Sequence, residues 1–226
     1  MIPYRLTLVV ALLFLSLSIF SQTYIGFKGG INQSKSTFFF NVNPLDATNS
    51  GDLNGFFFSI PVEININDYF NFMPELALVS DGTVLSVQAR EEQRVYNNSI
   101  FYAKVPLLGK LKVFKNKEYE FGVVGGIIPA FAIDVKSSYF TYANLRRTID
   151  IPISFKEAGI RRFDLALSIG LNTEKIIAKG WKLLLDIRYN GGMLDIESHS
   201  TLTNTSKSIQ LTFGLLAPLA KERKLL

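Results

Sequence analysis

The sequence of 226 residues contains no cysteine and only one histidine, His199. Without cysteine, neither a disulfide framework nor a Cys-based metal site can form. The spacing of the acidic residues contains no EF-hand or zinc-binding signature. Ser198 and His199 could suggest a lipid-modifying hydrolase, but adjacent side chains on an extended chain point apart, and only Asp195 and Glu197 are near enough to orient the imidazole. We therefore expect no catalytic residues, no cofactor and no metal ion.

The chain also lacks a strong charge bias, with 24 Lys and Arg residues against 19 Asp and Glu residues and a formal net charge of +5 at pH 7. The basic residues are scattered, and their one dense cluster is Lys221-Glu222-Arg223-Lys224 near the C-terminus. A nucleic-acid-binding domain gathers its basic residues on one face or along one helix. We therefore exclude nucleic acid as a partner.

The first 22 residues have the organisation of a secretory signal peptide. Arg5 and the terminal amine precede an apolar run from Leu6 to Phe20, and Ser21-Gln22 follow it. We expect cleavage near these two residues, although no A-x-A motif marks the site. The alternative is a permanent membrane anchor, for which the apolar run is short. The remaining chain is long enough for one all-β domain over residues 23–216, followed by a charged tail over 217–226.

Three segments of the mature chain alternate strictly between apolar and polar side chains, namely residues 162–171, 181–190 and 208–215. In the first of them, Phe163, Leu165, Leu167, Ile169 and Leu171 share one face. A helix would scatter these residues around its circumference, so this period indicates β-strands.

Five earlier segments follow the same pattern less strictly, over residues 24–33, 55–66, 69–80, 100–114 and 118–133. Each can span a bilayer as a tilted strand, which takes about 9–11 residues. Pro61, Pro74, Pro106 and Pro129 fall inside these segments. Because proline removes a ladder hydrogen bond, we expect bulges or broken pairing at these positions.

The connections between the eight segments alternate between long and short. Residues 67–68, 115–117 and about 173–180 form the short ones, and 34–54, 81–99, 134–161 and 191–207 form the long ones. Long loops without regular structure count against a soluble domain. They are expected on the outer surface of an outer-membrane barrel, whose short turns face the periplasm. We therefore predict an eight-stranded antiparallel up-and-down transmembrane β-barrel in the outer membrane of a Gram-negative bacterium, with extracellular loops and periplasmic termini.

Alternation alone does not say which face of the strands meets lipid. Aromatic residues cluster near the strand ends, as they do in interfacial girdles; they are Tyr69, Phe70, Phe114, Tyr119 and Trp181 on the turn side and Phe56, Phe101, Phe131, Phe163 and Tyr189 on the loop side. The polar face is rich in Gly, Ala, Ser and Asn, which suits a narrow lumen. Both features favour a membrane barrel over the alternative, a soluble lipocalin-like periplasmic barrel that buries its apolar face.

Charged residues of both signs occupy the predicted inward face. An eight-stranded barrel is just wide enough for side chains to fill its interior, and buried charges persist when they are paired. We therefore predict a structural charge network in the lumen and no wide pore. Its members are Lys28, Glu63, Glu75, Lys104, Lys110, Arg162, Asp164, Lys182, Asp186 and Arg188.

The sequence resembles the PorT-like outer-membrane β-barrel family of Bacteroidetes envelopes. The resemblance spans the mature chain, and its motifs are Gly26-Phe27-Lys28-Gly29-Gly30-Ile31-Asn32, Met73-Pro74-Glu75-Leu76, Val105-Pro106-Leu107-Leu108-Gly109-Lys110, 163–170 and 188–196. It implies an eight-stranded outer-membrane barrel and, for one branch of the family, a role in type IX secretion and gliding. One departure is that Phe213 is followed by Gly214-Leu215-Leu216-Ala217-Pro218, whereas outer-membrane barrels usually end on an aromatic residue.

Two classes of function follow from these observations. The first is a non-enzymatic envelope barrel that contacts outer-membrane lipid and docks envelope or secretion-machinery proteins. The second is a membrane-embedded lipid-modifying enzyme, for which His199 is the only candidate. Replacing His199 by alanine separates the two classes.

Overall fold

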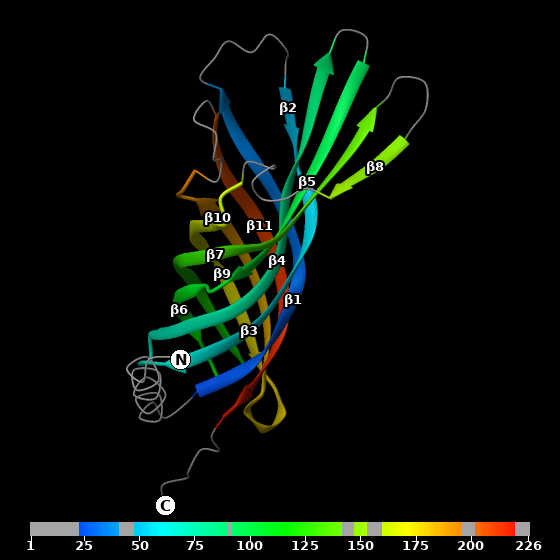
Figure 1. Ribbon diagram of the computed structural model, residues 1–226. Helices are drawn as coiled ribbons and strands as arrows, with labels where there is room; N and C mark the ends of the chain where they lie inside the picture. The colour runs from blue at the N-terminus through cyan, green and yellow to red at the C-terminus, as the bar shows by residue number, and fades with distance from the viewer. Residues whose placement is uncertain are drawn as a thin grey trace, which may run out of the picture.

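The computed structural model describes residues 23–40, 48–89, 92–141, 147–152, 160–195 and 202–219 (Figure 1). The predicted signal peptide, the chain beyond Leu219 and His199 lie outside these ranges. The described strands form one antiparallel sheet, which closes because the first strand pairs with the last along most of their length. The chain is thus a closed eight-stranded antiparallel meander barrel, as its alternation predicts.

Each predicted segment becomes one strand of the barrel wall. In chain order the wall strands are β1 (Thr23–Phe40), β3 (Leu53–Asn65), β4 (Phe70–Ala89), β5 (Glu92–Lys104) with β6 (Leu107–Lys115) as the two halves of the fourth, β7 (Tyr119–Thr141), β9 (Phe163–Ile176), β10 (Lys182–Gly192) and β11 (Leu202–Pro218). Two short strands lie outside the wall: β2 (Thr48–Gly51) pairs with β4, and β8 (Arg147–Pro152) pairs with β7.

The prolines interrupt the wall at two places. The fourth strand breaks at Val105-Pro106, where hydrogen bonding nevertheless continues, since Glu75 N donates to Pro106 O and Val105 N to Pro129 O, both at 2.9 Å. The β3–β4 ladder has a gap between the Pro61–Glu75 and Ile64–Phe72 pairs. The strand β7 instead runs unbroken through Pro129, which pairs with Leu165. On its other side, the ladder between β7 and the fourth strand is interrupted between the Ala130–Lys104 and Ile127–Leu107 pairs. The predicted disruption is therefore confirmed next to all four prolines.

The strands on the loop side are longer than the alternation predicts. Residues 81–99 do not form a long loop, because β4 and β5 remain paired as far as Ala89 and Glu92. The apolar alternation of the sequence ends near Asp81, whereas the ladder continues. The β-branched residues Thr83, Val84, Val87 and Val95 favour an extended backbone there. The figure shows these extensions rising above the barrel (Figure 1).

Three short turns close the other end of the barrel. Asn67 Oδ1 accepts hydrogen bonds from the N–H groups of Tyr69 at 2.9 Å and Phe70 at 2.8 Å. Asn116 Oδ1 does the same for Glu118 and Tyr119 in the β6–β7 turn. A single 3-10 turn, η1 (Ala178–Gly180), precedes β10. Because β1 starts and β11 ends at this side, it is called the turn end below.

Among the described residues there is no helix that is long and apolar enough to cross a membrane.

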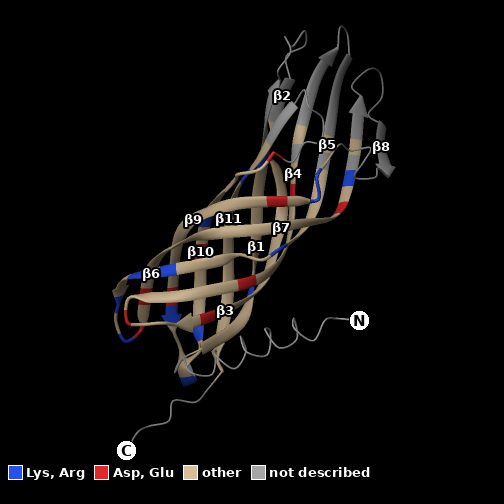
Figure 2. Cartoon of the chain, turned by 60° about the vertical axis from the view of Figure 1, so that its left-hand side comes forward, with Lys and Arg blue, Asp and Glu red and all other residues tan. Residues whose placement is uncertain are grey.

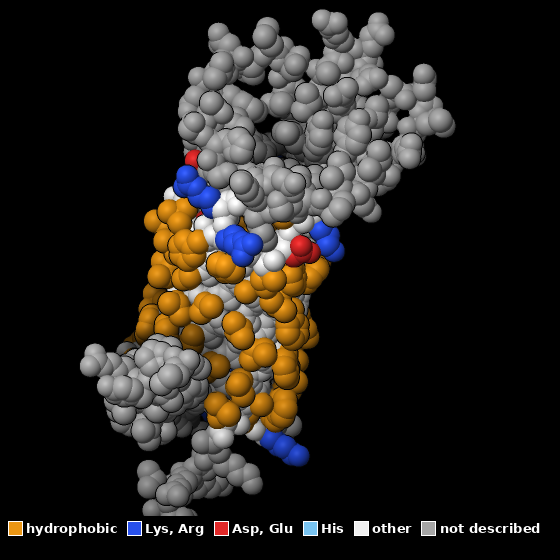
Figure 3. All heavy atoms as spheres, in the orientation of Figure 1, with side chains coloured by type: hydrophobic (Ala, Val, Ile, Leu, Met, Phe, Trp, Pro, Cys, Tyr) orange, Lys and Arg blue, Asp and Glu red, His pale blue; other side chains and the backbone are white. Residues whose placement is uncertain are grey.

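The outer surface of the wall is an apolar band (Figure 3). Outward side chains such as Phe27, Ile169 and Phe213 are 63%, 62% and 59% exposed. The predicted girdle residues are also exposed at both rims, with Phe101 partly covered by the ring of Phe56, 5.8 Å away between centroids. A soluble barrel has the opposite polarity, so the lipocalin-like alternative is excluded.

Candidate functional site

Lys, Arg, Asp and Glu residues are distributed along the strands of the barrel (Figure 2). Most of the buried ones lie on the inner face. The structure places nine of the ten predicted network residues inside, each at most 7% exposed: Lys28, Glu63, Glu75, Lys104, Lys110, Asp164, Lys182, Asp186 and Arg188. The tenth, Arg162, precedes β9 at the loop side and is exposed. The inward charges divide into three groups along the barrel axis, separated by uncharged side chains.

The middle group joins three strands across the lumen. Glu75 on β4 accepts from Lys28 Nζ and from Arg188 Nη2, both at 2.7 Å. Lys28 also donates to Asp186 at 3.0 Å, and Asp186 pairs with Arg188. Ser59 Oγ donates to the second oxygen of Glu75 at 3.2 Å. Each of the two cations and two anions therefore has at least one ion-pair partner of opposite charge.

Two inward glycines leave room for the basic side chains of this group. Gly170 faces Arg188 on the neighbouring strand, and a Cβ at Gly170 would lie 2.8 Å from Arg188 Cγ and 2.2 Å from Ile187 O. Gly214 faces Lys28 in the same way, and a Cβ there would lie 2.7 Å from Phe27 O. The small residues that the sequence places on the inward face therefore provide the space that long inward cations need.

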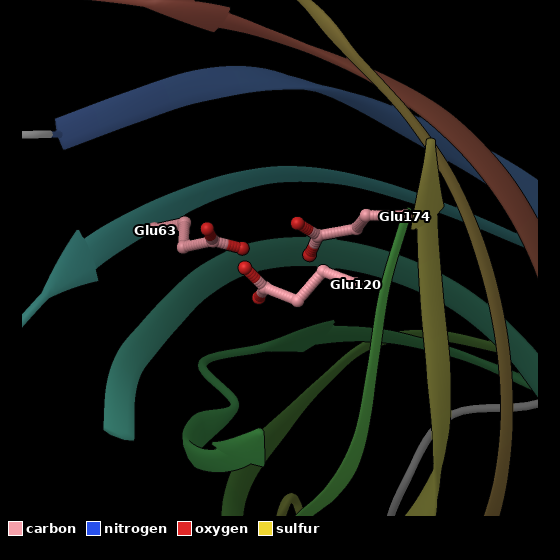
Figure 4. A group of neighbouring side chains, drawn as sticks. All are labelled: Glu63, Glu120 and Glu174. Atoms are coloured by element: carbon pink, nitrogen blue, oxygen red, sulfur yellow. The ribbon is translucent and has the colours of Figure 1, made fainter. Parts of the chain in front are cut away.

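The turn-end group contains three carboxylates and two ammonium groups. Glu63, Glu120 and Glu174 come from three different strands, and their side chains converge in the lumen (Figure 4). Lys110 pairs with Glu174 and lies 2.5 Å from Glu120 and 3.8 Å from Glu63. Lys182 binds Glu63 at 2.5 Å and Glu174 at 2.8 Å. With every group ionised, this cluster carries one excess negative charge.

The three carboxylates have the spacing of a metal site, since one oxygen from each lies within 4.8 Å of the others. The ammonium of Lys110, however, is already among them and makes ion pairs with all three. A divalent cation would have to displace this buried charge. The geometry is therefore that of an internal ion-pair cluster.

An apolar layer separates the turn-end group from the middle group. Met73, Leu108, Val124, Leu184 and Leu216 come from five strands and pack together, each with an exposed fraction of 0%. On β10 the order is explicit: Lys182 belongs to the turn-end group, Leu184 to the layer and Asp186 to the middle group. Water has no contact with these five side chains, so the lumen is filled at this level.

The loop-side group is smaller. Asp81 pairs with Lys104 and accepts from Asn32, and Asp164 accepts from Ser206 Oγ at 3.0 Å. A second apolar cluster lies beside it, formed by Ile100, Tyr102, Ala130, Ala132 and Val135.

Glu120 lies within a predicted segment, whereas two other central members of the network, Asp81 and Glu174, lie beyond the ends of the predicted segments. Both continue the inward parity of their strands, since Asp81 follows Val79 on β4 and Glu174 follows Asn172 on β9. Their outward neighbours, such as Thr173 and Lys175, are polar, so the alternation that marks a strand fades there. If the alternation of inward and outward positions is continued for four residues beyond each predicted segment, Asp81 and Glu174 both fall on the inward face.

The candidate for catalysis, His199, lies outside the described residues. Within the described ranges, the three glutamates above are the only group of three or more potential metal ligands.

An apolar exterior around a paired, charged interior in a closed sheet is the arrangement of a barrel that spans a membrane. Residues 20–217 match the outer membrane protein beta-barrel domain family, and the chain belongs to this family. It is therefore an outer-membrane β-barrel protein.

Solved structures of other outer-membrane proteins are similar to the chain at low identity. Ail, the attachment invasion locus protein of Yersinia pestis, is 12% identical with a TM-score of 0.41, over 87% of this chain and 99% of that one. OprG from Pseudomonas aeruginosa is 10% identical with a TM-score of 0.47, over 87% and 96%. Neisserial surface protein A is 12% identical with a TM-score of 0.40, over 86% and 96%. No curated protein matches the sequence.

Proposed function

We propose that this chain is a non-enzymatic envelope barrel that docks protein partners at its two ends and passes no solute through its lumen. The observation that carries this proposal is the filled lumen, in which an apolar layer with 0% exposure lies between two groups of ion pairs that cross the barrel. A pore-forming barrel needs a water-filled path. A barrel without one contributes to the envelope through its exposed ends.

The unequal ends of the barrel support a proposed orientation in the membrane. We place the loop side, with its long strand extensions, outside the cell and the turn end in the periplasm, as in bacterial barrels generally. The absence of native cysteine makes this testable with single introduced cysteines. In intact cells, a membrane-impermeant maleimide should label Asp52→Cys on the loop side and leave Lys117→Cys on the turn side unlabelled. Labelling of Lys117→Cys alone would reverse the assignment.

The resemblance to PorT-like proteins narrows the docking role to an accessory of type IX secretion or of surface interaction. Deleting the protein should then reduce secretion or surface attachment. Cross-linking in intact envelopes should capture a specific envelope protein. Intact secretion and attachment in the deletion strain would remove the support for this narrower role.

The lipid-modifying alternative depends on His199. In our proposal, His199→Ala leaves the lipid composition of the envelope and the deletion phenotype unchanged. A changed lipid profile with normal amounts of folded barrel would favour the enzyme instead.

A further inference from the structure

A cavity of about 1030 Å³ opens at the turn end of the barrel. We call it the turn-end vestibule. It is lined by the three short turns and by the ends of the wall strands β1, β3, β4, β6, β7, β9, β10 and β11. Its floor includes Glu120 and Lys182 of the turn-end charge group. This cavity is distinct from the filled lumen and from the apolar outer surface described above.

Cations outnumber anions in the lining of the vestibule, which has five lysines and two acidic residues. Lys182 and Glu120 are already neutralised within the charge group. The others are Lys112, Lys115, Lys117 and Lys179 against a single Asp68. None of these four lysines forms an ion pair with a carboxylate of the described residues. The vestibule therefore has an excess of positive charge.

Lys112 is the innermost of these cations and is only 6% exposed. Its ammonium donates to Asn65 Oδ1 at 2.7 Å and to the backbone oxygen of Asn67 at 3.0 Å, both of which are neutral acceptors. Since an ammonium has three N–H donors, one remains for a ligand. A buried cation gains most from an anionic partner, because the surroundings screen it weakly.

A second, independent feature of the vestibule is Asn71. Its side chain lines the cavity, is 1% exposed, and has a buried Oδ1 without a hydrogen-bond donor among the described residues. Leaving such a buried acceptor unsatisfied is unfavourable. A bound N–H group would satisfy it.

We infer that the turn-end vestibule binds an extended acidic polypeptide segment of a partner on that side of the membrane. Carboxylates of the segment would bind Lys112, Lys115, Lys117 and Lys179, and a backbone N–H would bind Asn71 Oδ1. This inference deepens the proposed docking function and rests on it for the side of the membrane only.

Size and distribution of charge favour a peptide over a small anion. Pockets for drug-sized ligands have volumes of about 300–1,000 Å³, and the vestibule lies at the top of this range. Lys115 and Lys117 belong to the β6–β7 turn, whereas Lys179 belongs to the β9–β10 turn. A chain with several carboxylates can place a separate carboxylate at each of these two turns. A lipid chain is disfavoured, since it would meet Glu120 and Lys182 at the floor.

The test uses the full chain in nanodiscs of zwitterionic phosphatidylcholine and a fluorescent dodecapeptide that alternates Glu with Leu. Binding is measured by fluorescence anisotropy. The triple variant Lys115→Gln, Lys117→Gln, Lys179→Gln changes only exposed side chains outside the internal network, so the barrel keeps its fold. Because the triple variant removes three of the cations that would pair with the carboxylates of the peptide, it should raise the Kd of the peptide about tenfold. Added salt should also weaken binding to the unmodified chain.

A matched control makes the same charge change at the loop side, where Lys35, Lys136 and Lys207 are exposed. The variant with these three lysines replaced by glutamine should bind the peptide with unchanged Kd. A peptide that alternates Gln with Leu should not bind at all.

Three results would overturn the inference: equal binding of the peptide by the turn-end triple variant, equal binding of the Gln peptide, or displacement by phosphate or phosphatidylglycerol at constant ionic strength. The last would identify a phosphate-group site instead of a peptide site. A conducting lumen would contradict the proposed function but leave the peptide result valid, and lost peptide binding would leave the sealed lumen intact.

Discussion

Arg188 Nη2 and Glu75 Oε1 lie 2.7 Å apart, although their strands stand on opposite sides of the barrel. Three wall strands separate β4 from β10 in either direction around the sheet. Their side chains therefore span the full width of the lumen. This bond, with those of Lys28 and Asp186, connects strands that share no backbone ladder.

Glu75→Gln should destabilise the barrel strongly. The substitution leaves Lys28 and Arg188 with Asp186 as their only carboxylate in the middle group. Removing one partner of a buried ion pair costs about 3–5 kcal/mol. Urea unfolding of the barrel in lipid vesicles measures this loss. The exposed Glu118→Gln should stay within about 0.5 kcal/mol of the unmodified chain, and equal stability of the two variants would contradict the network.

Gly170→Ala should also lower the free energy of unfolding, because the new methyl group would meet Ile187 O and Arg188 Cγ. Overpacking of this kind costs about 1–3 kcal/mol. The control is Gly29→Ala, whose Cβ would have its nearest neighbour at 3.8 Å. If both variants unfold at the same urea concentration, the lumen is not as tightly filled as described.

Lys110→Ala should turn the turn-end charge group into a cation site. Without the ammonium, Glu63, Glu120 and Glu174 keep an arrangement in which three oxygens can approach one ion. Calcium favours such oxygen ligands, and binding to the folded state raises stability. The temperature at which the variant unfolds should rise when calcium is added and fall again when EDTA removes the calcium. The unmodified chain and Lys28→Ala should not respond to either, and a calcium response of the unmodified chain would refute the assignment.

Ile169→Arg should destabilise the barrel through its lipid face. Ile169 lies near the centre of β9 and is 62% exposed. Arginine on the lipid face of a barrel costs about 2–4 kcal/mol at the bilayer midplane and about 0–1 kcal/mol near the interface. Leu219 is similarly exposed but follows the end of β11, so Leu219→Arg is the matched control. Equal unfolding free energies would mean that this band does not face lipid.

The alternation of apolar and polar residues predicts all eight wall strands because each crosses a region where its two faces meet different surroundings. It also predicts which charges point inward. It does not predict where β4 and β5 end, since the alternation ends near Asp81 while the ladder continues to Ala89 and Glu92. Asp81 and Glu174 were missed for the same reason, because the residues next to them no longer alternate between apolar and polar. Arg162 was wrongly assigned to the charge network because it lies just outside the wall, where the alternation no longer marks the inward face.

The pairing of charges within the lumen could not be predicted from the sequence. Which inward residues share a level depends on the stagger of the strands around the closed barrel, and this stagger comes from many individual registers. Lys182 and Glu63, for example, are 119 positions apart in sequence and lie on strands that are not neighbours. Composition predicts that the charges pair, and only the three-dimensional register identifies the partners.

The central claim is that the lumen is sealed by the apolar layer and the ion pairs on both sides of it. Planar bilayer recordings of the purified full chain test this claim most directly, with a wide porin as the positive control for insertion. The account predicts no stepwise current from barrels whose insertion is verified by protease protection. Regular single-channel steps from these barrels would show a continuous aqueous path and contradict it.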